Sequence, residues 1–80
     1  MITQYIDAAM RLAKYKILED DGSYYGEIPE CRGVWANELT LEATVDDLRS
    51  TLEGWISLGV ELGAELPVIA GIDLNALAVA

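Results

Sequence analysis

The sequence predicts an α+β domain in which three antiparallel strands and a fourth strand form one sheet, with a long helix packed on one face. Two patterns lead to this fold class. Residues 14–38 show the alternation of strands, interrupted by turn-forming residues. Residues 41–62 repeat apolar side chains at steps of three and four, as an amphipathic helix does. The order of elements in this core is βββαβ. An extra N-terminal helix is expected before the first strand.

The segment before the first strand has helical spacing. Its polar residues, among them Gln4, Asp7 and Arg11, fall mostly on one face. We therefore expect a short amphipathic helix over Thr3–Leu12, whose apolar stripe must be covered by the sheet or by a second subunit. The stripe consists of Ile2, Tyr5, Ile6, Ala9, Met10 and Ala13.

Three strands are expected next, over residues 14–19, 23–28 and 33–38. An Asp-Asp-Gly turn at residues 20–22 joins the first two as a hairpin, because Asp tolerates and Gly favours a positive φ angle. Pro29 ends the second strand, because proline has no amide hydrogen to donate to a ladder.

The second strand has two distinct faces. Tyr24, Gly26 and Ile28 share one face, which we expect to lie under the long helix. Tyr25 and Glu27 then lie on the opposite face. Aromatic residues there are either contact residues for a partner or simply residues that suit strands.

The long helix is expected over Leu41–Leu62. The Thr40 hydroxyl can cap its first turn, Gly63 suits its C-terminal cap, and Pro67 prevents the helix from resuming. We expect Val68–Leu74 to form the fourth strand, which either joins an edge of the sheet or pairs with another subunit. The apolar stripe of the helix is Leu41, Val45, Leu48, Leu52, Ile56 and Gly59.

The length of 80 residues predicts a single domain over 1–80, with 1–13 as an N-terminal extension and 14–74 as the core. A hydrophobic fraction of 52% suits a folded core. Because so short a chain buries a modest share of its surface, oligomerisation would add stability, and we expect a homodimer or tetramer.

The chain is strongly acidic, with 14 Asp and Glu against 5 Lys and Arg and a net charge of −9. We expect no direct nucleic-acid binding by the isolated chain, because phosphate contacts need clustered basic residues. The charge suits a basic partner, although solubility alone also explains it.

The sequence predicts a cytoplasmic location. Cys31 is the single cysteine, so nothing indicates an oxidising compartment. The segment Ile2–Leu12 is interrupted by polar residues and is neither a signal core nor a membrane span.

The composition argues against catalysis. Histidine, the commonest general base and metal ligand, is absent. The adjacent pairs Asp20-Asp21 and Asp46-Asp47 are expected in a turn and in the first turns of a helix for local reasons. Arg32 can lower the pKa of Cys31 slightly, but a small, partly buried side chain is the simpler interpretation. We predict no enzyme activity, no cofactor and no metal site.

One stretch resembles a known family. Tyr-x-Gly-Glu-Ile-Pro at residues 24–29, Gly-Val-x-Ala at 33–36 and Thr-Leu-Glu-Ala at 40–43 occur in the order seen in HicB-like antitoxins. The resemblance extends from about Lys14 to Pro67. Arg32 departs from the proline that the family commonly has there. The expected form is the short one, without the C-terminal DNA-binding domain of longer members.

The resemblance implies a partial RNase H-like fold and a binding function. Such antitoxins bind and occlude a small basic HicA-type toxin, a ribonuclease that cleaves mRNA. An alternative is an orphan HicB-like domain that forms homo-oligomers and has an interaction or regulatory role without a toxin. Regulation of transcription would need a DNA-binding element, which neither charge nor length supplies. We expect the partner contacts to be Asp20, Asp21, Tyr25, Glu27, Glu30 and Trp35.

Overall fold

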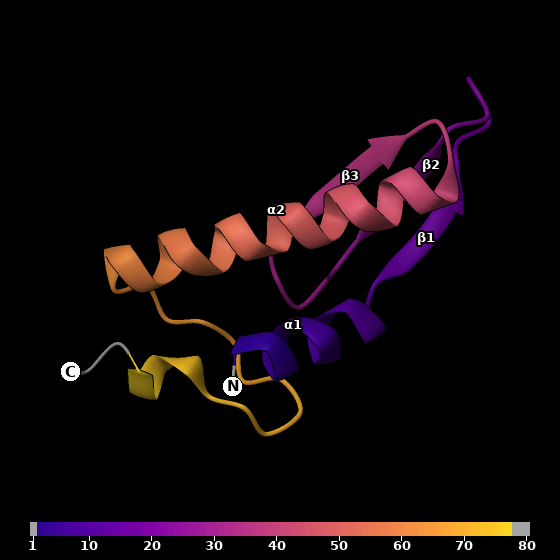
Figure 1. The fold of residues 1–80 in the computed structure, drawn as a ribbon. Helices are drawn as coiled ribbons and strands as arrows, with labels where there is room; N and C mark the ends of the chain where they lie inside the picture. Colours follow the sequence, from indigo (N-terminus) through magenta and orange to yellow (C-terminus); the bar gives the residue numbers. More distant parts are fainter. Residues whose placement is uncertain (1, 78–80) are drawn as a thin grey trace.

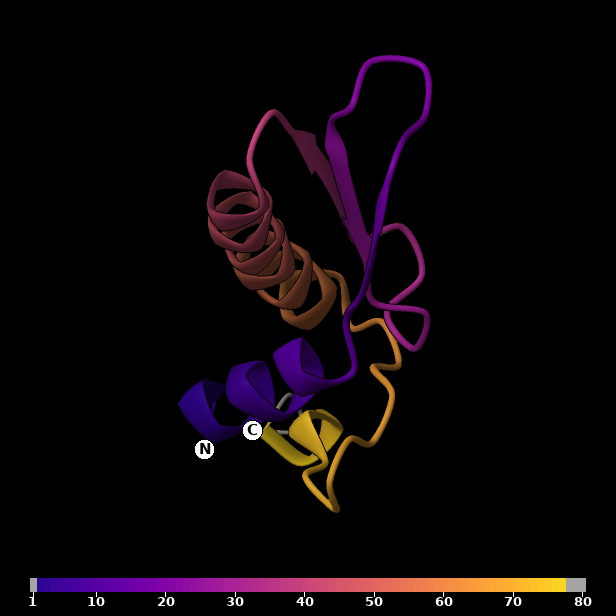
Figure 2. The same cartoon turned by 90° about the vertical axis from the view of Figure 1, so that its right-hand side faces the viewer.

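The computed structural model describes residues 2–77 and confirms the α+β class (Figure 1). The strands form one antiparallel sheet of order β1-β2-β3, and α2 lies along one of its faces (Figures 1 and 2). The elements are α1 (Ile2–Arg11), β1 (Lys14–Ile17), β2 (Tyr24–Glu27), β3 (Trp35–Glu38), α2 (Leu41–Leu62) and the 3-10 helix η1 (Leu74–Leu77).

A row of residues crosses the sheet beneath α2. Gly26 of β2 pairs with Tyr15 of β1 and with Ala36 of β3. A Cβ atom on Gly26 would lie 2.6 Å from the Tyr15 ring and 3.3 Å from Cγ2 of Thr44 in α2. The assignment of Gly26 to the helix side is therefore confirmed, and the Tyr15 ring occupies the space that a side chain on Gly26 would need.

The three strands are shorter than predicted, with four residues each. The hairpin turn already begins at Leu18, where Gly22 N–H donates to the Leu18 carbonyl over 2.9 Å. Cys31 N–H likewise donates to the Ile28 carbonyl over 2.9 Å, which folds residues 28–34 into a turn. The alternation pattern assigned Leu18 and Ile28 to strands, but their carbonyls accept these turn hydrogen bonds, so the strands end before them.

The helix α2 has the predicted bounds and caps. Thr40 Oγ1 accepts from the Ala43 N–H over 3.1 Å, and Gly63 ends the helix with a left-handed φ of 68°. The buried face starts at Thr44 rather than at Leu41, which is exposed. The Thr44 hydroxyl is satisfied by the carbonyls of Tyr24 and Thr40, at 3.1 and 2.8 Å. The buried residues of α2 are Thr44, Leu48, Leu52, Ile56 and Gly59.

The predicted fourth strand over Val68–Leu74 is wrong. Within residues 2–77 this segment makes a single isolated bridge between Ile69 and Ile72, across a tight turn. The turn residues Ala70 and Gly71 have φ angles of 51° and 75°, which reverse the chain before a strand can extend. The segment therefore folds on itself instead of adding to the sheet.

A side-chain clamp holds this C-terminal segment in place. Asn75 Oδ1 accepts from the Leu66 N–H, and Asn75 Nδ2 donates to the Leu66 carbonyl, both over 2.7 Å. The amide thus replaces the pair of hydrogen bonds that a neighbouring strand would have made. Leu66 packs so closely on α2 that a Cβ on Gly59 would lie 2.7 Å from its Cδ2 atom.

The N-terminal helix is covered within the same chain, which answers one alternative left open by the sequence. Tyr5 is fully buried, and its hydroxyl donates to the Pro67 carbonyl over 2.7 Å. Arg49 of α2 forms an ion pair with Asp7 of α1 at 3.1 Å. Figures 1 and 2 show α1 lying between α2 and the C-terminal segment.

Candidate functional site

The face of the sheet that points away from α2 carries a stacked aromatic pair. The rings of Tyr25 and Trp35 have centroids 6.1 Å apart and an interplanar angle of 19°. Trp35 is 55% exposed, although it is one of the largest apolar side chains of the protein. The ladder register places further polar residues on this face. We call this surface the open sheet face, and it consists of Lys14, Lys16, Tyr25, Glu27, Trp35 and Asn37.

Two lysines of β1 belong to this face. Lys16 Nζ lies 5.3 Å from the centroid of the Tyr25 ring, in a cation–π arrangement. Lys14 is the ladder partner of Glu27. The sequence analysis did not include these lysines in the contact set, although alternation in Lys14–Ile17 together with the hairpin register could have identified them.

The acidic residues of the chain gather elsewhere. Exposed carboxylates recur along α2, at Glu42, Asp46, Glu53 and Glu61. The open sheet face, by contrast, carries two lysines and one glutamate. The aromatic pair therefore lies on β2 and β3, whereas the main acidic surface lies on α2. The side chains suited to apolar contact with a partner are thus separate from those that attract a charged partner over a distance.

The predicted contact residues fall into three places. Tyr25, Glu27 and Trp35 meet on the open sheet face. Asp20 and Asp21 lie in the β1–β2 turn. Glu30 lies in the β2–β3 loop, at the other end of β2. The six residues thus lie on three different segments, and their role as partner contacts stays a prediction.

Asp21 has a local structural role. Its Oδ1 atom accepts from the Ser23 hydroxyl over 2.6 Å and from the Ser23 N–H over 2.9 Å. These two hydrogen bonds lower the pKa of the Asp21 carboxyl below its ordinary value, because they favour the ionised form. The carboxylate is already engaged in shaping the hairpin turn.

Cys31 is an interior residue. Its side chain is fully buried beside Tyr5. Burial raises the pKa of the Cys31 thiol to about 11, and the charge of Glu30 adds to this effect. Arg32 is not among the causes of this shift, so the pKa is raised rather than slightly lowered, and the simpler interpretation of a buried side chain fits. The thiol is protonated at neutral pH and packs as a small apolar group.

The described part of the chain shows neither a cluster of metal-binding side chains nor a helix that could span a membrane. Within residues 2–77, no three Cys, Asp or Glu side chains converge closely enough to hold a metal ion. Over the same residues, neither helix combines the length and the apolar character needed to cross a bilayer.

Comparison with known proteins identifies a family and a similar solved structure. A family model described as UPF0150-like matches residues 4–67. The crystal structure of TTHA0281 from Thermus thermophilus is similar to this chain, with 32% sequence identity and a TM-score of 0.81. The alignment covers 90% of this chain and 89% of the other. No curated protein matches.

Proposed function

The chain belongs to the UPF0150-like family, and we propose that it is a HicB-like antitoxin, which binds and occludes a small basic HicA-type toxin that cleaves mRNA. The proposal includes the partial RNase H-like assignment of the sheet and α2, and a cytoplasmic location. In this proposal the chain has no catalytic role. It acts by covering the RNA-binding and catalytic surface of its partner.

The residues that carry the HicB resemblance mostly serve the fold. Gly26 lies against the Tyr15 ring, and Gly33 adopts a φ of 91° in the β2–β3 loop. Thr40 caps α2. These residues support the likeness of architecture, whereas the argument for partner binding must come from exposed side chains.

The observation that carries the proposal is the exposed Tyr25–Trp35 stack. Tyrosine and tryptophan are the residues most enriched in the energetic centres of protein interfaces. Covering the exposed half of Trp35 would remove about 100–130 Å² from water, which corresponds to about 3 kcal/mol. The rings already stack on each other, so little side-chain entropy is lost on binding.

The charge of the chain as a whole, rather than that of the open sheet face with its two lysines and one glutamate, favours a basic partner. A net charge of −9 attracts a basic protein over distances of about one Debye length and accelerates encounter. The carboxylates of α2 supply much of this field, while the aromatic pair anchors the partner. Glu27 then offers a carboxylate next to the anchor, and Asp20 and Glu30 extend the acidic margin at the two ends of the sheet.

The test is co-expression with the short basic protein encoded beside this chain, followed by co-purification and an RNA-cleavage assay. We expect a stable complex that blocks cleavage. Trp35→Ala should weaken the complex by at least about 30-fold, because a hot-spot residue contributes about 2 kcal/mol or more. Val68→Ala is the matched control, because Val68 is similarly exposed but lies in the C-terminal segment, outside the sheet. Equal effects of the two variants would remove the open sheet face as the contact surface.

A second candidate, an orphan HicB-like domain that forms homo-oligomers, also has a specific observation in its favour. Within residues 2–77, β1 and β3 each pair with one strand only, so both edges of the sheet lack a hydrogen-bonded neighbour. Leu58 and Leu62 expose 56% and 72% of their surface near the end of α2. Such features are typical of surfaces that another copy covers. Sedimentation of the isolated chain would distinguish a stable oligomer from a monomer that awaits its partner.

A further inference from the structure

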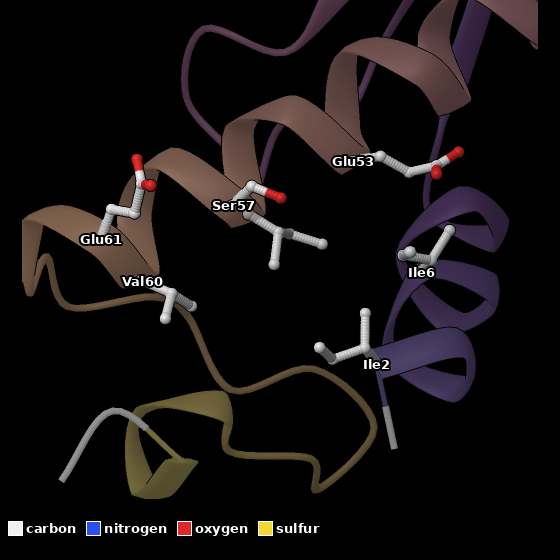
Figure 3. Close-up of a pocket in the computed structure, with 7 residues that line it drawn as sticks. Ile2, Ile6, Glu53, Ser57, Val60 and Glu61 are labelled. Carbon is white, nitrogen blue, oxygen red and sulfur yellow. The ribbon is translucent and has the colours of Figure 1, made fainter. Parts of the chain in front are cut away.

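A groove between α1 and α2 forms a second apolar surface on this protein (Figure 3). It encloses about 360 Å³ and shares no residue with the open sheet face. Its apolar side chains come from both helices. They are Ile2, Ile6, Ile56 and Val60.

The apolar character of the groove is only partly used by the fold. Ile6 and Ile56 are buried and belong to the hydrophobic core. Ile2 and Val60, by contrast, are 47% and 36% exposed. The floor of the groove is therefore formed by the core residues Ile6 and Ile56, whereas Ile2 and Val60 are accessible to a ligand.

One wall of the groove is acidic. Glu53, Ser57 and Glu61 follow one another at steps of four along α2, so they lie on the same side of the helix. Figure 3 shows Ser57 between Glu53 and Glu61 along α2, with the Glu53 carboxylate on the α1 side and the Glu61 carboxylate directed away from Val60. Eight residues of helix separate the carboxylates by about 12 Å along the axis. None of the groove-lining residues is basic.

An ion pair links the two helices at one end of the groove. Arg49 lies one helical turn before Glu53 and forms the 3.1 Å ion pair with Asp7 of α1. Arg49 is thus already engaged with a carboxylate of the other helix. Both side chains of this pair are about half exposed, so the pair adds only modestly to the attachment of the two helices.

A second copy of this chain is a poor occupant. A two-fold dimer that packs α2 antiparallel to its symmetry mate across Ser57 would place each Glu53 beside Glu61 of the other copy. A parallel arrangement would place Glu53 beside Glu53. Both arrangements bring carboxylates together over an apolar contact, where like charges are strongly unfavourable.

We propose that this groove binds a cationic amphipathic helix of a partner protein. Apolar side chains at i and i+3 or i+4 enter between Ile2 and Val60, and two Lys or Arg residues about eight positions apart pair with Glu53 and Glu61. The spacing of the two carboxylates selects the spacing of the basic residues. This second docking surface is independent of the toxin proposal, because it requires a basic helix but not a ribonuclease.

The probe is a fluorescent peptide of about 18 residues, or five helical turns, built from Leu and Lys with all leucines on one face. Anisotropy titration with the whole chain measures its affinity. The control peptide has the same composition, with leucines spread around the helix. We expect the amphipathic peptide to bind at least about tenfold more tightly than the control.

Two charge-matched variants locate the site. Glu53→Gln with Glu61→Gln should weaken peptide binding at least about fivefold. Glu42→Gln with Asp46→Asn removes the same charge from α2 outside the groove and should change it less than about twofold. Val60→Asp should weaken binding at least about tenfold, because it places a charge among the apolar contacts.

Several outcomes would overturn the inference. Equal weakening by the two charge variants would show diffuse attraction to an acidic protein rather than a site. Absence of peptide binding up to about 1 mM would show that the groove lacks useful affinity. A dimer of the chain that Val60→Asp dissociates would identify a second copy as the occupant. These experiments use the isolated chain and a peptide, without the toxin. Their results therefore do not depend on whether the antitoxin proposal is correct.

Discussion

Replacing Gly26 by valine tests how tightly the sheet packs beneath α2. The new Cβ would lie 2.6 Å from the Tyr15 ring, whereas ordinary contacts between carbon atoms are near 3.5–4.0 Å. The ring must therefore move by about 1 Å, and the valine methyl groups also approach Cγ2 of Thr44, which is only 3.3 Å from the Cβ position. Tyr15 lies on an edge strand and is 38% exposed, so part of the strain can be relieved by rotation of the ring.

The expected destabilisation is about 1–3 kcal/mol, the usual range for overpacking a core. For a domain of this size, about 2 kcal/mol corresponds to a fall in Tm of about 8–16 °C. Thermal denaturation followed by circular dichroism measures this change. Gly54→Ala is the control, because nothing lies within 4 Å of its Cβ position and alanine favours the helix.

A double-mutant cycle identifies the cause. Tyr15→Ala removes the ring, so Gly26→Val should be about 1 kcal/mol less destabilising in that background. Additive effects would show that the Tyr15 ring is not the obstacle. An unchanged Tm for Gly26→Val would refute the close packing of this row.

Two further predictions concern the C-terminal clamp and the buried titratable groups. Asn75→Ala should lower the free energy of unfolding by about 2 kcal/mol, because it leaves the N–H and the carbonyl of the buried Leu66 without partners. Urea unfolding measures this loss. Unchanged hydrogen exchange at the Leu66 N–H would contradict the prediction. Stability should also fall at high pH. Burial raises the pKa of Cys31 from 9.0 to about 11 and that of Tyr5 from 10.0 to about 12. The stability that comes from the protonated thiol and phenol is therefore complete below pH 9, and it declines as the pH rises through the folded pKa values. Urea unfolding at neutral pH and near the folded pKa of Cys31 should show a smaller decline for Tyr5→Phe than for the parent chain, and equal declines would contradict this assignment.

Local signals predicted most of the fold. The bounds of α2 follow from a threonine cap, a left-handed glycine and a long apolar stripe, each of which depends only on residues close to it in the sequence. The alternation around Gly26 correctly placed β2 relative to the helix. The strand ends were less predictable, because Leu18 and Ile28 look like strand residues but their carbonyls accept turn hydrogen bonds.

The C-terminal segment shows where local signals fail. Val68–Leu74 has the composition of a strand, but the positive φ of Ala70 is unusual for a non-glycine residue and was not expected. The position of Asn75 next to Leu66 depends on how the chain returns after α2. Long-range contacts of this kind leave no periodic trace in the sequence.

The candidate site was predictable only in part, for the same reason. Alternation placed Tyr25 on the face away from α2, whereas the β2–β3 register is what brings Trp35 to the same face. The distribution of charge around them depends on the register of β1, which places Lys14 and Lys16 on that face. The groove requires the pairing of α1 with α2, which no spacing within either helix specifies.

The positions that carry the family resemblance and those that carry the proposed contacts respond to different constraints. Gly26 is required by the Tyr15 ring packed against it, and Thr40 by the hydroxyl cap of α2, so substitutions there act on stability whatever the partner. The side chains of Trp35 and Glu61 are exposed, so substitutions there should act mainly on binding, and a Trp35 variant additionally loses the stack on Tyr25, worth about 0.5–1.5 kcal/mol. Proteins with this fold can therefore keep the same strand–turn–helix motif while their open sheet faces and grooves are adapted to different partners.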